Sequence, residues 1–196
     1  MPSTVAIPLA LLASYLLGSV SFGILIASYR GVDIRTAGSG NPGASNIMRV
    51  LGKKDAVAVL LGDGLKGVGA AWIGVAVGGP ELGYVTLLVA VIGHTFPIWH
   101  GLKGGKSVAT ALGGLIYLAP AVGIALGLLW IVMVLVWKTA SIASITVMVL
   151  MVPALWVADR TKTEILLAAV ISVFVLLRHA SNIKRLIASS EQKVTE

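Results

Sequence analysis

The chain has 196 residues, of which 57% are hydrophobic and 12% are charged, with a formal net charge of +7 and no cysteine. A soluble domain of this length cannot bury so large an apolar fraction, and the composition also excludes intrinsic disorder, disulfides and a cysteine nucleophile. We therefore expect one all-α integral membrane domain over residues 1–196, and we interpret the positive charge as cytoplasmic loops rather than as binding to nucleic acid.

Several apolar segments are long enough to cross a bilayer, which takes about 20 residues of helix. In chain order they are 4–28, 55–77, 82–99, 107–137, 141–158 and 164–178. The uncharged run 107–137 is too long for one helix, and Pro120 divides it, so we expect two spans there, with a re-entrant segment as the alternative. The sequence thus predicts about seven transmembrane helices.

The distribution of basic residues predicts the orientation. If the N-terminus lies outside, twelve Lys and Arg residues fall in cytoplasmic segments and only Arg160 and Lys162 fall outside. A single crossing over 107–137 would instead place Lys138 and the basic C-terminus outside. Because cytoplasmic loops carry the excess of Lys and Arg, we expect an external N-terminus and a cytoplasmic C-terminus.

A glycine-rich segment follows the first span. Residues 38–46 have the sequence GSGNPGASN, and Arg49 follows them. Such a segment can turn several backbone N–H groups toward an anion, and an arginine offers a planar fork that suits phosphate. The alternative is a flexible loop with a basic residue on the cytoplasmic side.

A second glycine-rich segment, Lys103–Ser107, precedes the uncharged run. It is not a Walker motif, because His100 stands where glycine is required and no strand precedes it. Two lysines and two glycines before a helix nevertheless favour an anion, and Ser107 is expected to cap that helix. The alternative is a plain basic loop, and His94 by itself is interpreted as a structural histidine.

Polar residues also occur within or at the start of spans. Lys138, Ser141 and Ser144 are three apart and are expected to share one helix face, where helix packing is the alternative to chemistry. Asp63 and Lys66 lie inside a span, where structural pairing and function are both open.

The end of the last span carries His179, Asn182 and Arg185 at intervals of three, so that one helix face can present all of them. The alternative is a basic terminus lying on anionic lipid. With no cluster of carboxylates, we expect no metal and no cofactor. Taken together, the residues predict a cytoplasmic site for a phosphorylated ligand, without deciding whether that ligand is bound, moved or transformed.

Five blocks in order resemble a known family: GSGNPGASNIMR (38–49), GDGLKG (62–67), GHTFPIWHGLKGGKSVAT (93–110), KTASIASI (138–145) and RHASNIKRL (178–186). They are similar to the bacterial acyl-phosphate:glycerol-3-phosphate acyltransferases, the PlsY family. Ser107 replaces a glycine that the family usually has, and Trp99 and His100 replace its usual aromatic residues. None of these departures removes a charged element.

The resemblance implies transfer of a fatty acyl group from acyl phosphate to the 1-hydroxyl of sn-glycerol 3-phosphate. The products would be 1-acylglycerol 3-phosphate (lysophosphatidate) and phosphate, as a step of phospholipid synthesis. The enzyme would be a monomer in the bacterial cytoplasmic (inner) membrane, with its active site near the cytoplasmic face. A transporter for organophosphate anions is the alternative, but it predicts an internal repeat, and the sequence shows none convincingly.

On this hypothesis the site residues fall into two groups. Those that bind phosphate are Ser39, Gly40, Asn41, Gly43, Asn46, Arg49, Lys103, Gly104, Gly105, Ser107, Ser141 and Arg185. The catalytic group is Lys106, Ser144, His179 and Asn182. Lys106 is expected to be the most important cation. His179 is expected to act as the general base, unless the phosphate of the acyl donor accepts the proton.

Overall fold

The computed structural model describes residues 5–194, and all regular structure within them is helical. In chain order the elements are α1 (Ala6–Ser19), α2 (Phe22–Tyr29), α3 (Ala44–Leu51), α4 (Lys53–Gly78), α5 (Pro80–Thr95), a 3₁₀ turn (Ile98–His100), α6 (Val108–Leu118), α7 (Pro120–Trp137), α8 (Ala140–Val157), α9 (Lys162–Arg178) and α10 (Ala180–Ile187).

Five helical segments of the described chain are long and apolar enough to cross a bilayer: Ala6–Tyr29, α4, Pro80–His100, α7 and α8. The pair α9 and α10 is a sixth candidate, although the chain bends by 55° between them. The expected division at Pro120 is confirmed, because α6 ends at Leu118 and α7 begins at Pro120. Helix α6, however, has 11 residues, a rise of about 16 Å, which is roughly half of the hydrocarbon thickness.

Local sequence explains where the helices begin and end. Pro120 is the first residue of α7, where its missing N–H leaves no helical bond unmade. Gly52 and Gly79 adopt φ angles of 93° and 85° at the two ends of α4, a conformation that favours glycine. Thr161 and Glu164 form a capping box that starts α9.

Helix α4 lies at the centre of the fold and contacts α1, α3, α5 and α6. Its approach to α6 requires glycine. A Cβ on Gly67 would lie 2.0 Å from the carbonyl oxygen of Thr110, and one on Gly113 would lie 2.1 Å from that of Gly64. Small residues allow such close backbone contacts between helices in membranes. The contact fixes the start of α6 and therefore the Lys103–Ser107 segment before it.

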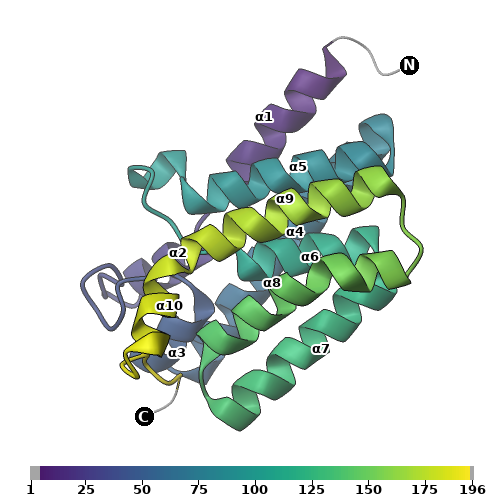
Figure 1. Ribbon diagram of the computed structural model, residues 1–196. Coiled ribbons are helices and arrows are strands. Elements are labelled where there is room, and N and C mark those ends of the chain that lie inside the picture. Colours follow the sequence, from purple (N-terminus) through teal and green to yellow (C-terminus); the bar gives the residue numbers. More distant parts are fainter. Residues whose placement is uncertain (1–4, 195–196) are drawn as a thin grey trace.

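The surface and the arrangement of the helices agree with a membrane-embedded protein. Large apolar side chains such as Leu135, Trp156 and Leu177 are exposed, as lipid solvation allows. Figure 1 shows α2, α3 and α10 gathered at one end of the molecule, with the turn between α8 and α9 at the opposite end. The six apolar segments expected from the sequence are helical within residues 5–194, with a break between α1 and α2 and another at Ala119. This agrees with the membrane-embedded, all-α class, and five or six of the helical segments are long enough to cross a bilayer.

Candidate active site

A cavity of about 340 Å³ lies among α3, α4, α6, α7, α8 and α10. Its polar part is lined from the segments 39–49, 106–107, 141–144 and 179–192. Its apolar part is lined from α4, α6 and α7, by residues that include Leu60, Leu65, Val68, Leu112, Ile116 and Ile131. One continuous cavity therefore joins a cationic end to an apolar cleft between helices.

The 38–46 segment is a folded loop held by Asn46. The Asn46 side chain accepts a hydrogen bond from the backbone N–H of Ser39 (2.8 Å) and donates one to the carbonyl of Ala37 (3.0 Å). Ser39, Asn41 and Gly43 line the cavity as a result. Asn46 is fully buried, and its hydrogen bonds indicate that it shapes the loop from behind.

The Lys103–Ser107 segment is fastened to the end of α5. The N–H groups of Gly104 and Gly105 donate to the carbonyls of Thr95 (3.0 Å) and His94 (3.1 Å). The Ser107 hydroxyl donates to the Val91 carbonyl (2.9 Å) and shares a hydrogen bond with Thr95 (2.8 Å). The prediction that Ser107 caps α6 is wrong, because its side chain turns back toward α5 and caps no N–H.

Lys106 extends from this segment into the cavity, and its ammonium donates a hydrogen bond to Oδ1 of Asn182. Burial lowers the pKa of Lys106 from 10.5 to about 8, and the nearby Arg185, Arg178 and Arg49 cations add to this effect while Glu191 opposes it. A partly buried cation close to other cations is strongly stabilised in its charged form when an anion binds beside it.

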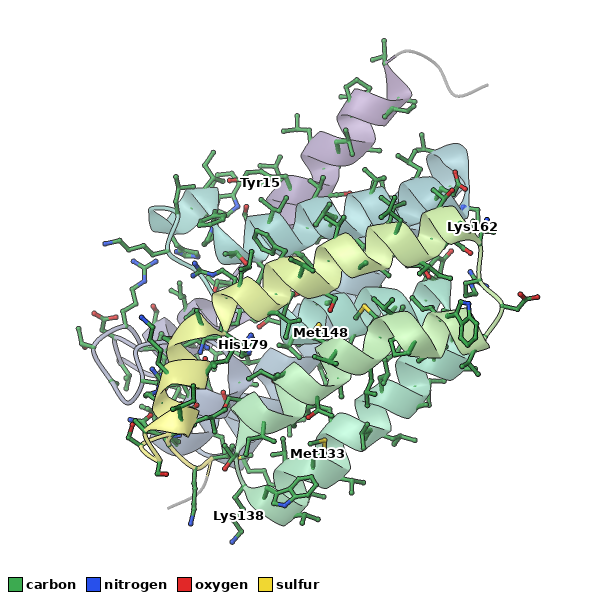
Figure 2. The ribbon with its side chains drawn as sticks, viewed as in Figure 1. Tyr15, Met133, Lys138, Met148, Lys162 and His179 are labelled. Atoms are coloured by element: carbon green, nitrogen blue, oxygen red, sulfur yellow. The ribbon has the colours of Figure 1, made fainter. Side chains whose placement is uncertain are left out.

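His179 lies at the bend between α9 and α10. Figure 2 shows this residue beside the start of α10. Its Nδ1 is 2.8 Å from the carbonyl oxygen of Val175. A carbonyl only accepts, so the proton is on Nδ1, and Nε2 is an acceptor at the cavity wall. Burial lowers the pKa of His179 from 6.5 to about 4, with Lys106 contributing and the Val175 carbonyl opposing. The imidazole is therefore neutral at physiological pH.

The bend also changes how the C-terminal polar residues are presented. Because α9 ends at Arg178 and α10 starts at Ala180, the two segments do not form one straight helix. His179 is the residue between the two helices, and Asn182 and Arg185 follow on α10. All three line the same cavity.

The C-terminal tail closes one side of the cavity. Glu191 accepts hydrogen bonds from Asn182 (2.5 Å) and Arg185 (2.7 Å). Burial raises the pKa of Glu191, but these hydrogen bonds outweigh it and leave the pKa below its usual value. The Arg49 guanidinium donates to the backbone carbonyls of Lys193 (2.5 Å) and Gln192 (3.1 Å). The tail thus holds Arg49, Asn182 and Arg185 in position.

Two serines of α8 line the cavity, as the sequence predicts, but Lys138 does not share their helix face. Lys138 ends α7 with a φ of 54°, and α8 begins at Ala140. Ser144 accepts a hydrogen bond from Nε1 of Trp130 (3.0 Å). Ser141 is buried, and its hydroxyl lies close enough to Glu191 to help lower the pKa of that carboxyl.

A buried charged cluster, formed by Asp63, Lys66 and His94, supports the Lys106 segment. The Lys66 ammonium is 2.9 Å from Oδ1 of Asp63, 2.5 Å from Nδ1 of His94 and 2.7 Å from the carbonyl oxygen of Val20. Asp63 and His94 also line the cavity. The cluster joins the break between α1 and α2 to α4 and α5.

The structure brings most of the predicted site residues together. Those that line the cavity are Ser39, Asn41, Gly43, Arg49, Lys106, Ser107, Ser141, Ser144, His179, Asn182 and Arg185. Those outside its lining are Gly40, Asn46, Lys103, Gly104 and Gly105. Sequence reasoning missed Glu191 and did not connect His94 with Asp63 and Lys66, because these partners meet only through the fold. Among residues 5–194, no group of three or more His, Cys, Asp or Glu is placed to hold a metal.

The sequence and the fold were compared with known proteins. The glycerol-3-phosphate acyltransferase family matches residues 8–189. A glycerol-3-phosphate acyltransferase of Agrobacterium fabrum is 40% identical over 95% of this chain and 91% of its own length. A glycerol-3-phosphate acyltransferase of Aquifex aeolicus is 41% identical over 92% of this chain and 95% of its own length.

Solved structures agree with the sequence matches. A crystal structure of PlsY (YgiH), an integral membrane glycerol 3-phosphate acyltransferase in its glycerol 3-phosphate form, superposes with a TM-score of 0.90. The two sequences are 40% identical, and the matched region covers 95% of this chain and 94% of the PlsY chain. The lysophosphatidic acid form gives a TM-score of 0.88, with the same identity and coverage.

Proposed function

Because the chain belongs to the glycerol-3-phosphate acyltransferase family, represented by PlsY, we propose that it transfers a fatty acyl group from acyl phosphate to the 1-hydroxyl of sn-glycerol 3-phosphate. The products are 1-acylglycerol 3-phosphate and inorganic phosphate. The observation that carries this proposal is the single cavity with a cationic end and an apolar cleft. An acyl phosphate and glycerol 3-phosphate need both, namely sites for two phosphates and one for a hydrocarbon chain.

The cationic end supplies the phosphate contacts. Lys106, Arg49 and Arg185 converge on it, and the first N–H groups of α6 lie beside Ser107 and Val108 in its lining. Cations and helix N-termini stabilise the charge that gathers on a departing phosphate. The acyl chain lies in the apolar cleft between α4, α6 and α7.

His179 orients the attacking hydroxyl. Its unprotonated Nε2 accepts the hydrogen bond of the 1-hydroxyl, which points an oxygen lone pair at the acyl carbon. An imidazole with a pKa of about 4 is a weak base at neutral pH. We therefore assign the proton to an oxygen of the leaving phosphate. In this step the hydroxyl oxygen bonds to the acyl carbon, the carbon–oxygen bond to phosphate breaks, and the proton departs with the phosphate.

We also propose that the site lies at the cytoplasmic face of the bacterial inner membrane. The polar end of the cavity coincides with the loops that carry most of the Lys and Arg residues, as the positive-inside rule favours. Seven passages follow if the short α6 and the longer α7 run in opposite directions. That topology puts the N-terminus outside and the C-terminus inside.

The proposal is tested with purified protein in detergent, palmitoyl phosphate and glycerol 3-phosphate, by following phosphate release with and without the acceptor. Release should depend on the acceptor and fall by more than about 100-fold in Lys106→Ala. Lys54→Ala removes an exposed lysine on the same side and should leave the rate unchanged. No acceptor-dependent release, or equal rates in the two variants, contradicts the proposal.

A further inference from the structure

The tautomer of His94 is fixed by Lys66. A lysine ammonium has three N–H donors and no acceptor. The Lys66 ammonium makes hydrogen bonds with the carbonyl oxygen of Val20 (2.7 Å) and with Nδ1 of His94 (2.5 Å), and it forms an ion pair with Asp63 at 2.9 Å. Nδ1 of His94 must therefore accept, and the ring carries its proton on Nε2. The chain thus holds two buried histidines of opposite tautomer, since His179 is protonated on Nδ1.

The protonated Nε2 of His94 is an unused donor within residues 5–194. Among the described residues no hydrogen bond reaches this atom, although the side chain is only 5% exposed and lines the cavity. It lies against Gly105, where an added Cβ would stand 2.2 Å from it. Because His94 lines the cavity, we infer that this N–H is available to a group bound there.

His94 contacts segments that lead to both parts of the cavity, and we infer that it lies near their junction. On α4, the neighbouring Asp63 and Gly64 line the cavity beside Leu60, Leu61 and Leu65 of its apolar part. On the other side, Gly105 leads directly to Lys106 at the cationic end. In an acyl phosphate the carbonyl group joins the hydrocarbon chain to the phosphate. A donor molecule with its chain in the cleft and its phosphate near Lys106 places that carbonyl at this junction.

We propose that His94 is a catalytic residue whose Nε2–H donates a hydrogen bond to the carbonyl oxygen of the acyl donor, and that Asp63 and Lys66 are positioning residues which hold the required tautomer. The inference rests on the proposed function. As the hydroxyl oxygen bonds to the acyl carbon, the carbonyl electron pair moves onto oxygen, and His94 stabilises the resulting charge while keeping its own proton. When the carbonyl re-forms, the bond to phosphate breaks.

The first test measures the tautomers directly. The chain has three histidines, so ¹⁵N-histidine NMR of the full-length protein in detergent can be assigned with single His94, His100 and His179 variants. We expect a protonated Nε2 and a bare Nδ1 for His94, and the reverse for His179. A His94 protonated on Nδ1, or on both nitrogens, at pH 7 overturns the inference without the need for any His94 variant to be active.

The second test is kinetic. His94→Met keeps the bulk and removes the donor, and it should lower kcat by about 100-fold while leaving the KM for glycerol 3-phosphate within about threefold. His94→Gln restores an N–H donor, and its kcat should be at least about tenfold higher than that of His94→Met. The same two changes at His100, which lies outside the cavity lining, should have no effect.

The outcomes separate the inference from the proposed function. If the wild-type protein does not use palmitoyl phosphate, the proposed function fails. If it does, and folded His94→Met keeps its kcat or His94→Gln recovers nothing, the role of His94 fails while the function stands. Thermal unfolding of each variant shows whether it is folded. Lys66→Met should shift the His94 tautomer in the NMR experiment, which a purely structural lysine would not do.

Discussion

Lys106 is expected to give the enzyme an alkaline limit that begins near pH 8. Its pKa lies at about 8 because it is buried and surrounded by arginines. It is charged below this value and loses its charge as pH rises, so that about nine tenths of free enzyme molecules carry the cation at pH 7 and about one tenth at pH 9. The phosphate of glycerol 3-phosphate has a second pKa of about 6 and does not change over this range.

This loss of charge should appear in kcat/KM, which reports the free enzyme. Above pH 8, kcat/KM for glycerol 3-phosphate should fall by about tenfold per pH unit. At saturation, kcat should fall less, because a bound phosphate dianion raises the pKa of Lys106. The assay is initial-rate phosphate release from pH 6 to 10, corrected at each pH for hydrolysis of palmitoyl phosphate without enzyme.

Two variants identify the titrating group. Arg178 lowers the pKa of Lys106 but does not line the cavity. Arg178→Gln should therefore shift the alkaline limb of the profile, the fall in kcat/KM above pH 8, to higher pH. Lys106→Arg keeps its charge to above pH 12 and should abolish the limb if activity remains. A wild-type profile that stays flat to pH 10, or an unchanged limb in Lys106→Arg, would refute the reasoning.

Three further predictions follow from the site and the fold. His179→Gln keeps an acceptor and should be roughly tenfold more active than His179→Ala; equal losses of about 1,000-fold in both would instead identify His179 as the base. Gly67→Ala should lower the free energy of unfolding by about 1–3 kcal/mol, since its Cβ meets backbone, whereas Gly127→Ala faces open space and should not; similar melting curves for both would contradict this. Glu191→Ala leaves Asn182 without its acceptor and should raise the KM for glycerol 3-phosphate about fivefold or more; an unchanged KM would show that the tail does not position the site.

The helices could be predicted from the sequence because hydropathy is a local property. The run 107–137 shows both the strength and the limit of that approach. Pro120 correctly marks the boundary between α6 and α7, but the shortness of α6 depends on the Lys103–Ser107 segment, which is fastened to α5 by hydrogen bonds. A hydropathy pattern cannot predict hydrogen bonds between two such segments.

The site could be predicted in outline, since most of the expected polar residues line one cavity. The errors arise where a side chain takes a distant partner or where the backbone leaves the helical conformation. Ser107 has the right position for a helix cap, but its hydroxyl makes hydrogen bonds with Thr95 and the Val91 carbonyl instead. Lys138 has the right spacing for a helix face, yet its left-handed conformation separates it from α8.

The roles of single residues were the least accessible to sequence reasoning. Glu191 stands in a polar tail with no periodic pattern, and only the fold brings it to Asn182 and Arg185. His94 resembles many structural histidines until Lys66, 28 positions away, is found at its Nδ1. The choice of tautomer is a property of the packed structure, and spacing in the sequence carries no information about it.

The central claim, acyl transfer from acyl phosphate within this cavity, is tested most directly by identifying the product. Purified protein is incubated with glycerol 3-phosphate and either palmitoyl phosphate or palmitoyl-CoA, and lipids and phosphate are quantified by mass spectrometry and a phosphate assay. We expect 1-palmitoylglycerol 3-phosphate and phosphate in equal amounts from palmitoyl phosphate, and no product from palmitoyl-CoA. Product from palmitoyl-CoA alone, or phosphate without acylated product, would contradict the claim.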